Sequence, residues 1–268
     1  MDEYKKMRLI GQGSFGSVYE ALDKFGRKAV LKEVVIAHLD DEKAHQARKE
    51  ADLLKSLCHP NIIRYFNHWE AEGVLTIAME YGRGGNLECF ISKQKTHLEE
   101  IRALKIFVQI LVAVEYLHRN GILHRDLSAN NVLICDGDVI KVCDFGQSKR
   151  LLSVQSGSIA GNPSHLAPEL CTGGKCSEES DMWALGCLLH HLLSLRRPFG
   201  SAGSIAQLLV SILTGPPPPL PRSFSKPLEG LIFSLLSSEP SARPKSSALL
   251  SHPLLALHVH RIHLGFSL

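Results

Sequence analysis

Three short motifs in the middle of the chain constrain its fold and chemistry more than any other feature. His124-Arg-Asp126 is followed by Asn131, the run Asp144-Phe-Gly146 begins thirteen residues after that asparagine, and Ala167-Pro-Glu169 comes last. Each motif alone is weak evidence, because such short runs are common. In this order and at this spacing, however, a chance coincidence is very improbable. The set therefore predicts that carboxylates and an amide from separate segments serve one catalytic site.

The residue types in these motifs suit the transfer of a phosphoryl group. A γ-phosphoryl in a loose transition state needs positioning and charge neutralisation more than covalent help. Asp144 and Asn131 offer hard oxygen ligands to Mg²⁺, which bridges the phosphates of ATP. Asp126 is suited to accept the proton of a substrate hydroxyl. The motifs therefore predict ATP and Mg²⁺ as cofactors, with Asp126 as the base and with Asn131 and Asp144 as metal ligands.

The segment between the second and third motifs contains candidate phosphorylation sites. Arg125, next to the predicted base, is suited to bind a phosphorylated residue of this segment. Ser153, Ser156 and Ser158 are the serines considered. We predict Ser158 as the phosphosite, and an unmodified loop serine is the alternative.

A glycine-rich run near the N-terminus predicts a loop that covers phosphates. Gly11-Gln-Gly-Ser-Phe-Gly16 also fits a dinucleotide-binding turn, for which Glu33 lies at a suitable distance. Residues 17–22 have the pattern of a strand rather than of an opening helix, however, and a βαβ unit is missing. A glycine loop between two strands lets backbone N–H groups approach phosphates, because no Cβ intervenes.

One lysine and one glutamate are predicted to form a pair. Lys32 follows Ala29-Val-Leu in an apolar strand, and a lysine there needs an anion or must leave the core. Glu50, eighteen residues later, falls on the apolar face of a predicted helix. A pair between them would hold the ammonium on the α- and β-phosphates. An ordinary solvated lysine and glutamate are the alternative on these two residues alone.

The rest of the pattern predicts a small β-rich part followed by a larger helical part. One helix, 40–57, interrupts the first part, and Gly82-Arg-Gly-Gly85 is a candidate hinge between the two. The predicted strands are 7–10, 17–22, 28–36, 62–69 and 74–80, and the later helices are 98–119, 180–195, 204–213, 228–237 and 246–251.

Composition excludes several classes of protein. The net charge of +3 on 268 residues is too small to indicate binding to nucleic acid or to an anionic membrane. The most apolar stretch, 106–117, is interrupted by Gln109 and Glu115 and is shorter than the 18 to 20 residues, roughly, of a membrane span. The chain also shows no signal-peptide pattern. Seven cysteines without a CxxC pair favour a reduced, intracellular protein.

Residues 4 to about 256 resemble the eukaryotic protein kinases and, within them, the NIMA-related serine/threonine kinases. The subgroup whose longer members carry an RCC1-like propeller is nearest. The resemblance implies a bilobal α+β protein kinase fold. Its N-lobe, 1–81, would be a small antiparallel β-sheet with one helix. Its C-lobe, 82–256, would be mainly helical and would hold the catalytic loop and the activation segment. Residues 257–268 would form a C-terminal tail. The local matches, besides the three motifs, are Val30–Glu33, Ile77–Tyr81 with Gly84-Gly85, Ser180–Cys187 and Leu235–Pro244.

The resemblance also assigns roles to single residues. Lys32, paired with Glu50, would bind phosphate, and the backbones of Glu80 and Gly82 would hold the adenine edge next to a gatekeeper, Met79. Two further matches concern packing rather than catalysis: Asp181 is a structural acid, and Arg243 would pair with Glu169. The nucleotide flap would comprise Ile10, Gly11, Gln12, Gly13, Ser14, Phe15, Gly16, Ser17 and Val18.

Several positions depart from the family pattern. Serine/threonine kinases usually carry a lysine two residues after the base, where it touches the γ-phosphate, and this chain has Ser128. Asn162 stands where a threonine is usual, and Ser164 and His165 replace an aromatic pair. Loss of a charge-assisted contact of about 1.5 to 3 kcal/mol would slow transfer about 10- to 100-fold.

These observations favour a weak protein serine/threonine kinase. An ATP-binding pseudokinase that acts as a regulatory scaffold is the alternative, and a dinucleotide oxidoreductase is a distant third. The expected partners are protein substrates, with an activating or scaffolding protein as a further candidate, and neither nucleic acid nor a membrane. The resemblance implies a cytoplasmic location, with the cytoskeleton, the centrosome and the cilium as sites where such kinases often act.

Overall fold

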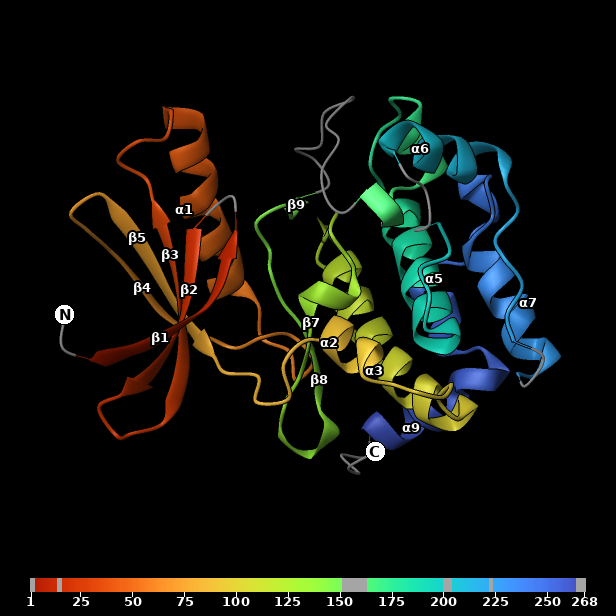
Figure 1. Cartoon of the computed structure of the whole chain (residues 1–268), viewed down its shortest axis with the longest axis horizontal. Coiled ribbons are helices and arrows are strands. Elements are labelled where there is room, and N and C mark those ends of the chain that lie inside the picture. The colour runs from red at the N-terminus through yellow and green to blue at the C-terminus, as the bar shows by residue number, and fades with distance from the viewer. Residues whose placement is uncertain (1–2, 14–15, 151–162, 200–203, 222–223, 264–268) are drawn as a thin grey trace. The chain divides into compact units, whose positions relative to one another are not determined.

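The computed structural model describes residues 3–13, 16–150, 163–199, 204–221 and 224–263. The chain divides into two compact units, Met1–Arg83 and Gly84–Leu268, called unit 1 and unit 2 below. Unit 1 is a sheet with one helix and unit 2 is mainly helical, which confirms the predicted fold class (Figure 1). Among the described helices, none combines the length and the apolar character that crossing a bilayer requires.

Unit 1 is built on a five-stranded antiparallel sheet in the order β1-β2-β3-β5-β4. Its central strands are rich in Val, Ile and Leu, which suit a pleated surface that is buried on one or both faces. Leu31, Leu75 and Ile77 are at most 3% exposed and form part of the core. The strands are β1 (Tyr4–Gly13), β2 (Gly16–Asp23), β3 (Lys28–Val35), β4 (Tyr65–Ala71) and β5 (Val74–Glu80).

The helix of unit 1, α1 (Asp41–Ser56), begins where the sequence predicts it. The Asp40 side chain accepts a hydrogen bond from the backbone N–H of Lys43 at 2.8 Å, which satisfies one of the free donors of the first turn. Ala51 and Leu54 are buried, and the helix packs against β4 and β5. Glu50 is buried on the same face, so the sheet must supply a partner for it.

Unit 2 is organised around two helices, α3 and α5, which Figure 1 shows at its centre. Both are apolar on nearly all sides, as expected for helices that are surrounded by protein. They pack against each other, α3 also packs against α8 and α9, and α5 also packs against α7. The helices are α2 (Leu87–Ser92), α3 (Glu100–Arg119), α4 (Pro168–Cys171), α5 (Glu178–Ser194), α6 (Ile205–Thr214), α7 (Lys226–Leu235), α8 (Ser246–Leu250) and α9 (Pro253–His263).

Four short strands of unit 2 carry the loops in which the central motifs lie. They form two separate two-stranded pairs, β6 with β9 and β7 with β8. The first pair stands directly before His124 and after Gly146, and the second stands between Asn131 and Asp144. The strands are β6 (Ile122–Leu123), β7 (Val132–Ile134), β8 (Ile140–Val142) and β9 (Lys149–Arg150).

Some elements differ from the sequence prediction. The strand expected from Ile62 begins at Tyr65; Ile62 and Ile63 precede it and are buried, and burial by itself favours apolar residues. Helices α2, α4 and α9 were not predicted. The tail expected over 257–268 is helical as far as His263, and Val259 is 7% exposed there; 264–268 lie outside the described residues.

Candidate active site

The glycine-rich run lies between two antiparallel strands of unit 1. β1 and β2 remain paired up to Gly13 and Gly16, and no helix follows β2 directly, so the dinucleotide-binding interpretation is wrong. Gly16 lies against β3, and a Cβ built on it would overlap the carbonyl oxygen of Glu33. Glycine is therefore required at this position for steric reasons. Ser14 and Phe15 lie outside the described residues.

Other residues that were assigned to nucleotide binding lie on the same sheet. Ile10 is 42% exposed on β1, and Val18 on β2 is paired with Lys32 on β3. Met79 and Glu80 end β5, and the Glu80 backbone N–H donates to the carbonyl oxygen of Arg64 at 2.9 Å. The remaining positions assigned to the flap that are described, Gly11, Gln12, Gly13 and Ser17, lie in β1 and β2, and Gly82 follows β5.

Lys32 and Glu50 form an ion pair. Lys32 Nζ on β3 lies 2.6 Å from Glu50 Oε1 on α1, and the two side chains are 13% and 9% exposed. This pair explains how a lysine in an apolar strand and an acid on an apolar helix face are both accommodated. An ion pair that is shielded from solvent to this degree needs a well-defined geometry, because only close contact compensates for the lost hydration of the two charges. It fixes the ammonium at one place on the sheet.

In unit 2, Asp126 and Asn131 are held together within the loop 124–131, called the catalytic loop below. Asn131 donates its side-chain N–H₂ to the Asp126 carboxylate at 2.8 Å and to the Asp126 carbonyl oxygen at 2.9 Å. The Asn131 side-chain oxygen, an acceptor, takes part in neither bond. One short loop therefore fixes a carboxylate and an amide oxygen relative to each other.

His124 connects this loop to the second motif. Its Nε2 lies 3.2 Å from the carbonyl oxygen of Cys143, and its ring lies 5.2 Å from the ring of buried Phe145. The Cys143 backbone N–H donates to the Asn131 carbonyl oxygen at 2.9 Å. Between these anchored neighbours stands Asp144, which is exposed and has φ of 61°. The flanking contacts thus place an exposed carboxylate next to Asn131.

Asp181, on α5, holds the start of the catalytic loop. Its two carboxylate oxygens accept the backbone N–H groups of His124 and Arg125, each at 2.9 Å. Arg125 has φ of 69°, a conformation that is costly for a residue with a Cβ, by about 1 to 2 kcal/mol. The buried acceptor compensates for this strain. Burial alone would raise the pKa of Asp181, but the hydrogen bonds with His118 and with the backbone N–H of Arg125 hold it below the ordinary value.

The third motif is fixed by Arg243. Its guanidinium donates to both carboxylate oxygens of Glu169, at 2.9 and 2.8 Å, and lies 5.0 Å from the ring centre of Trp183. Ser180 donates to Glu169 at 2.8 Å. Burial alone would raise the pKa of Glu169, but the hydrogen bonds and charge of Arg243 hold it below the ordinary value. The structure therefore contains the Arg243–Glu169 pair that the resemblance implied.

The positions that depart from the family pattern fall partly inside the described residues. Ser128 is 2% exposed, and Ser164 and His165 are buried, with the Ser164 hydroxyl 3.2 Å from His165 Nδ1. Burial is the main cause that lowers the pKa of His165 to about 3, with smaller contributions from the neighbouring His191 and Arg197, so this imidazole is neutral. Ser158, the predicted phosphosite, and Asn162 lie outside the described residues, as do Ser153 and Ser156.

Two residues that support the site were not predicted from the sequence. His118 Nε2 lies 3.1 Å from the Asp181 carboxylate, and the Ser148 hydroxyl donates to the His124 carbonyl oxygen at 3.1 Å. The signal for His118 was present, because a polar residue on the buried face of an apolar helix needs a partner. Ser148 gave no comparable signal, since its partner is a backbone group.

Comparison with known proteins agrees with the geometry. The family model described as a protein kinase domain matches residues 4–255. The serine/threonine-protein kinase Nek8 of Danio rerio is 37% identical over 96% of this chain and 38% of its own length, and Nek3 of Mus musculus is 37% identical over 96% and 50%. The kinase nekl-2 of Caenorhabditis elegans is 33% identical over 98% and 77%. The chain thus spans half or less of the length of the first two relatives.

Proposed function

The chain belongs to the protein kinase family and, within it, to the NIMA-related serine/threonine kinases, and from this premise we propose that it transfers the γ-phosphoryl of ATP to serine or threonine side chains of protein substrates. The observation that carries the proposal is the hydrogen bond between Asn131 and the Asp126 carboxylate. It supports the two groups acting together, one as a metal ligand and the other as the base.

Asp126 has the central chemical role in this proposal. Its carboxylate orients the substrate hydroxyl and accepts the proton as the oxygen attacks the phosphorus atom. Asn131 keeps the carboxylate in one orientation by donating to it. Asp181 holds the same loop by accepting hydrogen bonds from the backbone N–H groups of His124 and Arg125. A loop held at this many points needs little rearrangement when the reaction occurs.

The donor set of unit 2 suits Mg²⁺. The Asp144 carboxylate and the Asn131 side-chain oxygen are the hard ligands that this cation prefers, and Asp144 is exposed. When bound, the ion would neutralise charge on the phosphates. In unit 1, Lys32, held by Glu50, would neutralise further phosphate charge, and the backbone N–H groups of residues 10–18 would bind phosphate oxygens.

Protein substrates follow from the proposed activity. An activating or scaffolding protein partner and phosphorylation of Ser158 next to Arg125 belong to the same proposal. A phosphoserine carries about −1.5 to −2 charge and would pair with a guanidinium. Phosphorylation would in this way tie the segment before the third motif to Arg125.

A pseudokinase is the second candidate function, and Ser128 favours it. A buried serine replaces the lysine that usually neutralises the γ-phosphate, so one charge is missing where negative charge develops. The surviving base, metal ligands and Lys32 favour turnover, although slow. A chain that binds ATP and a partner without useful turnover would carry the same residues.

The first test is Mg²⁺-dependent transfer from ATP to a generic protein substrate, with the wild type beside Asp144→Asn. Transfer that disappears in this variant supports the kinase, and phosphoamino-acid analysis then tests for serine and threonine. Thermal unfolding with and without Mg²⁺ and ATP is the second readout. Stabilisation of the wild type by ATP without any transfer above the variant would support the pseudokinase instead.

A further inference from the structure

Unit 2 contains a cavity of about 470 Å³ that is lined by none of the residues assigned to phosphoryl transfer. Ligand-binding cavities in proteins have volumes of about 300 to 1,000 Å³. Helices α2 and α3 and the hairpin of β7 and β8 form its wall. The apolar part of this wall consists of Phe90, Ile101, Ile106, Ile134 and Ile140.

Backbone contacts fix the shape of this cavity. The Gly84 N–H donates to the Ile134 carbonyl oxygen at 2.8 Å, and a Cβ on Gly84 would come within 2.8 Å of the same oxygen. On the other side, Gln109 of α3 donates to the Asp138 carbonyl oxygen and accepts the Ile140 N–H, at 3.2 and 2.9 Å. The hairpin is therefore pinned to α3, and the cavity is already formed in the chain alone.

Four charged residues line the cavity along α3. Glu99 is the N-cap residue of α3, Arg102 and Lys105 follow on the helix, and Asp138, in the hairpin of β7 and β8, lies beside Gln109. From residue 99 to residue 109 a helix rises about 15 Å. Two cations thus lie between two acids. Among the described residues, none of the four is engaged in an ion pair, and Arg102 instead lies 5.4 Å from the Phe90 ring centre.

We propose that this cavity binds a short extended segment of a partner protein, with an acidic residue at its centre, an apolar residue on each side and basic residues at its ends. An extended segment rises about 3.3 Å per residue, so five residues match the spacing of the charges. Successive side chains of an extended segment point to opposite sides, so its two apolar residues point to one side and its three charged residues to the other. The acid meets Arg102 and Lys105, and the bases meet Glu99 and Asp138.

Ile101 adds an apolar contact at this site. Its side chain is 61% exposed although it lines the cavity, so a bound apolar residue would cover it. Burial of one such side chain contributes roughly 1.5 to 3 kcal/mol. The binding needs neither ATP nor turnover, so it is independent of the proposed phosphoryl transfer.

The test measures fluorescence anisotropy of two labelled, end-capped peptides with the full chain at low ionic strength. One is Lys-Leu-Glu-Leu-Lys, and the other, Glu-Leu-Lys-Leu-Glu, keeps the leucines and inverts the charges. We expect the first to bind at least about tenfold more tightly, since charge-assisted contacts differ in sign between the two. Equal binding, the opposite preference or no binding of the first peptide overturns the proposal.

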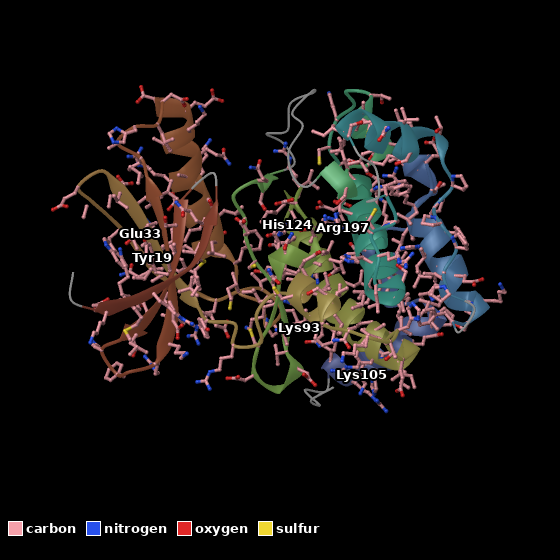
Figure 2. All side chains as sticks on the ribbon, in the orientation of Figure 1. Tyr19, Glu33, Lys93, Lys105, His124 and Arg197 are labelled. Atoms are coloured by element: carbon pink, nitrogen blue, oxygen red, sulfur yellow. The ribbon has the colours of Figure 1, made fainter. Side chains whose placement is uncertain are left out.

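Variants of the chain locate the site. Arg102→Glu with Lys105→Glu should weaken binding of the first peptide about tenfold or more. The matched control, Lys93→Glu with Lys95→Glu, reverses two charges that are exposed and outside the cavity, and it should leave binding unchanged (Lys93 and Lys105 are labelled in Figure 2). An equal loss in the control would mean a diffuse charge effect and would overturn the proposal.

A second pair of variants tests the apolar contact without changing the charge of the cavity. Ile101→Asn should weaken binding of the first peptide, whereas Ile205→Asn should not, because Ile205 is similarly exposed, at 67%, but lies on α6, away from the cavity. Both side chains are exposed, so both variants are expected to fold, which circular dichroism checks. Unchanged binding with Ile101→Asn contradicts the proposed location.

Discussion

At the scale of single residues, Ser128 sets the expected rate of the chain. Its carbonyl oxygen accepts the Asn131 backbone N–H at 3.0 Å, and Asp126 and Asn131 are bonded as described above. The backbone of the loop is therefore intact around the substitution. The loop carries Ser128 where serine/threonine kinases usually have a lysine, so under the proposed function one cation is missing near the γ-phosphate.

Restoring this cation should accelerate transfer. We expect Ser128→Lys to raise kcat about 10- to 100-fold, because one charge-assisted contact in the transition state is worth about 1.5 to 3 kcal/mol. Ser128→Met is the matched control, since methionine adds a side chain of similar length without the charge. Initial rates at saturating Mg²⁺ and ATP measure both. If the two variants accelerate transfer equally, or neither does, the missing charge is not what limits the rate.

The sequence predicted those residue pairs in which a charge interrupts an apolar pattern. Lys32 and Glu50 each stand on an apolar face, and each therefore needs a partner within reach. The Asp181–His118 contact joins residues 63 positions apart, and only the packing of α5 on α3 brings them together. The three hydrogen bonds by which Asp181 and Ser148 hold the backbone of His124 and Arg125 depend in the same way on tertiary structure.

At the scale of elements, the longest periodic segments were predictable, and two of the shortest helices were not. Helices α3 and α5 gave clear patterns, because 20 and 17 residues show several turns of one face. Helices α2 and α4 have 6 and 4 residues, too few for a period to appear. The strand β4 was placed too early, since Ile62 and Ile63 are buried although they precede the strand.

The turn between β1 and β2 offers a test at this scale. We expect Gly16→Ala to destabilise unit 1 by about 1 to 3 kcal/mol, because the new Cβ would overlap the Glu33 carbonyl oxygen and push β2 away from β3. Gly11→Ala is the control, since its Cβ would lie 3.7 Å from Val18 Cβ, an ordinary contact. Urea unfolding measures both. Similar stabilities of the two variants would contradict the steric argument.

At the scale of the whole molecule, the two units differ in how they respond to acid. In unit 2, burial lowers the pKa of His165, His190, His191 and His258 below the ordinary value of 6.5. In the folded chain these imidazoles take up protons at a lower pH than in the unfolded chain, where protonation begins as the pH falls towards about 6.5. The unfolded state then binds more protons, so acidification lowers the stability of unit 2.

Carboxyl groups act in the same direction, but at lower pH. In unit 1, a hydrogen bond from Lys28 lowers the pKa of Glu20, and one from Arg48 lowers that of Glu70. Their stabilising contribution is complete above the ordinary value of 4.5 and is lost as the pH falls through the lower folded value. The acid response of these groups thus begins about two pH units below that of the buried histidines in unit 2.

We therefore expect unit 2 to unfold at a higher pH than unit 1 when the chain is acidified in moderate urea. Each unit carries one of the two tryptophans, Trp69 on β4 and Trp183 on α5. Trp69→Phe leaves a reporter of unit 2 alone, and Trp183→Phe leaves a reporter of unit 1. The fluorescence transition of Trp183 should lie at least about one pH unit above that of Trp69, because the unfolded chain takes up protons on these histidines at a higher pH than on the carboxylates. Each unit has its own core, which permits separate transitions. Coincident transitions would mean that the two units unfold as one cooperative body, and the histidines of unit 2 would then set the acid limit of the whole chain.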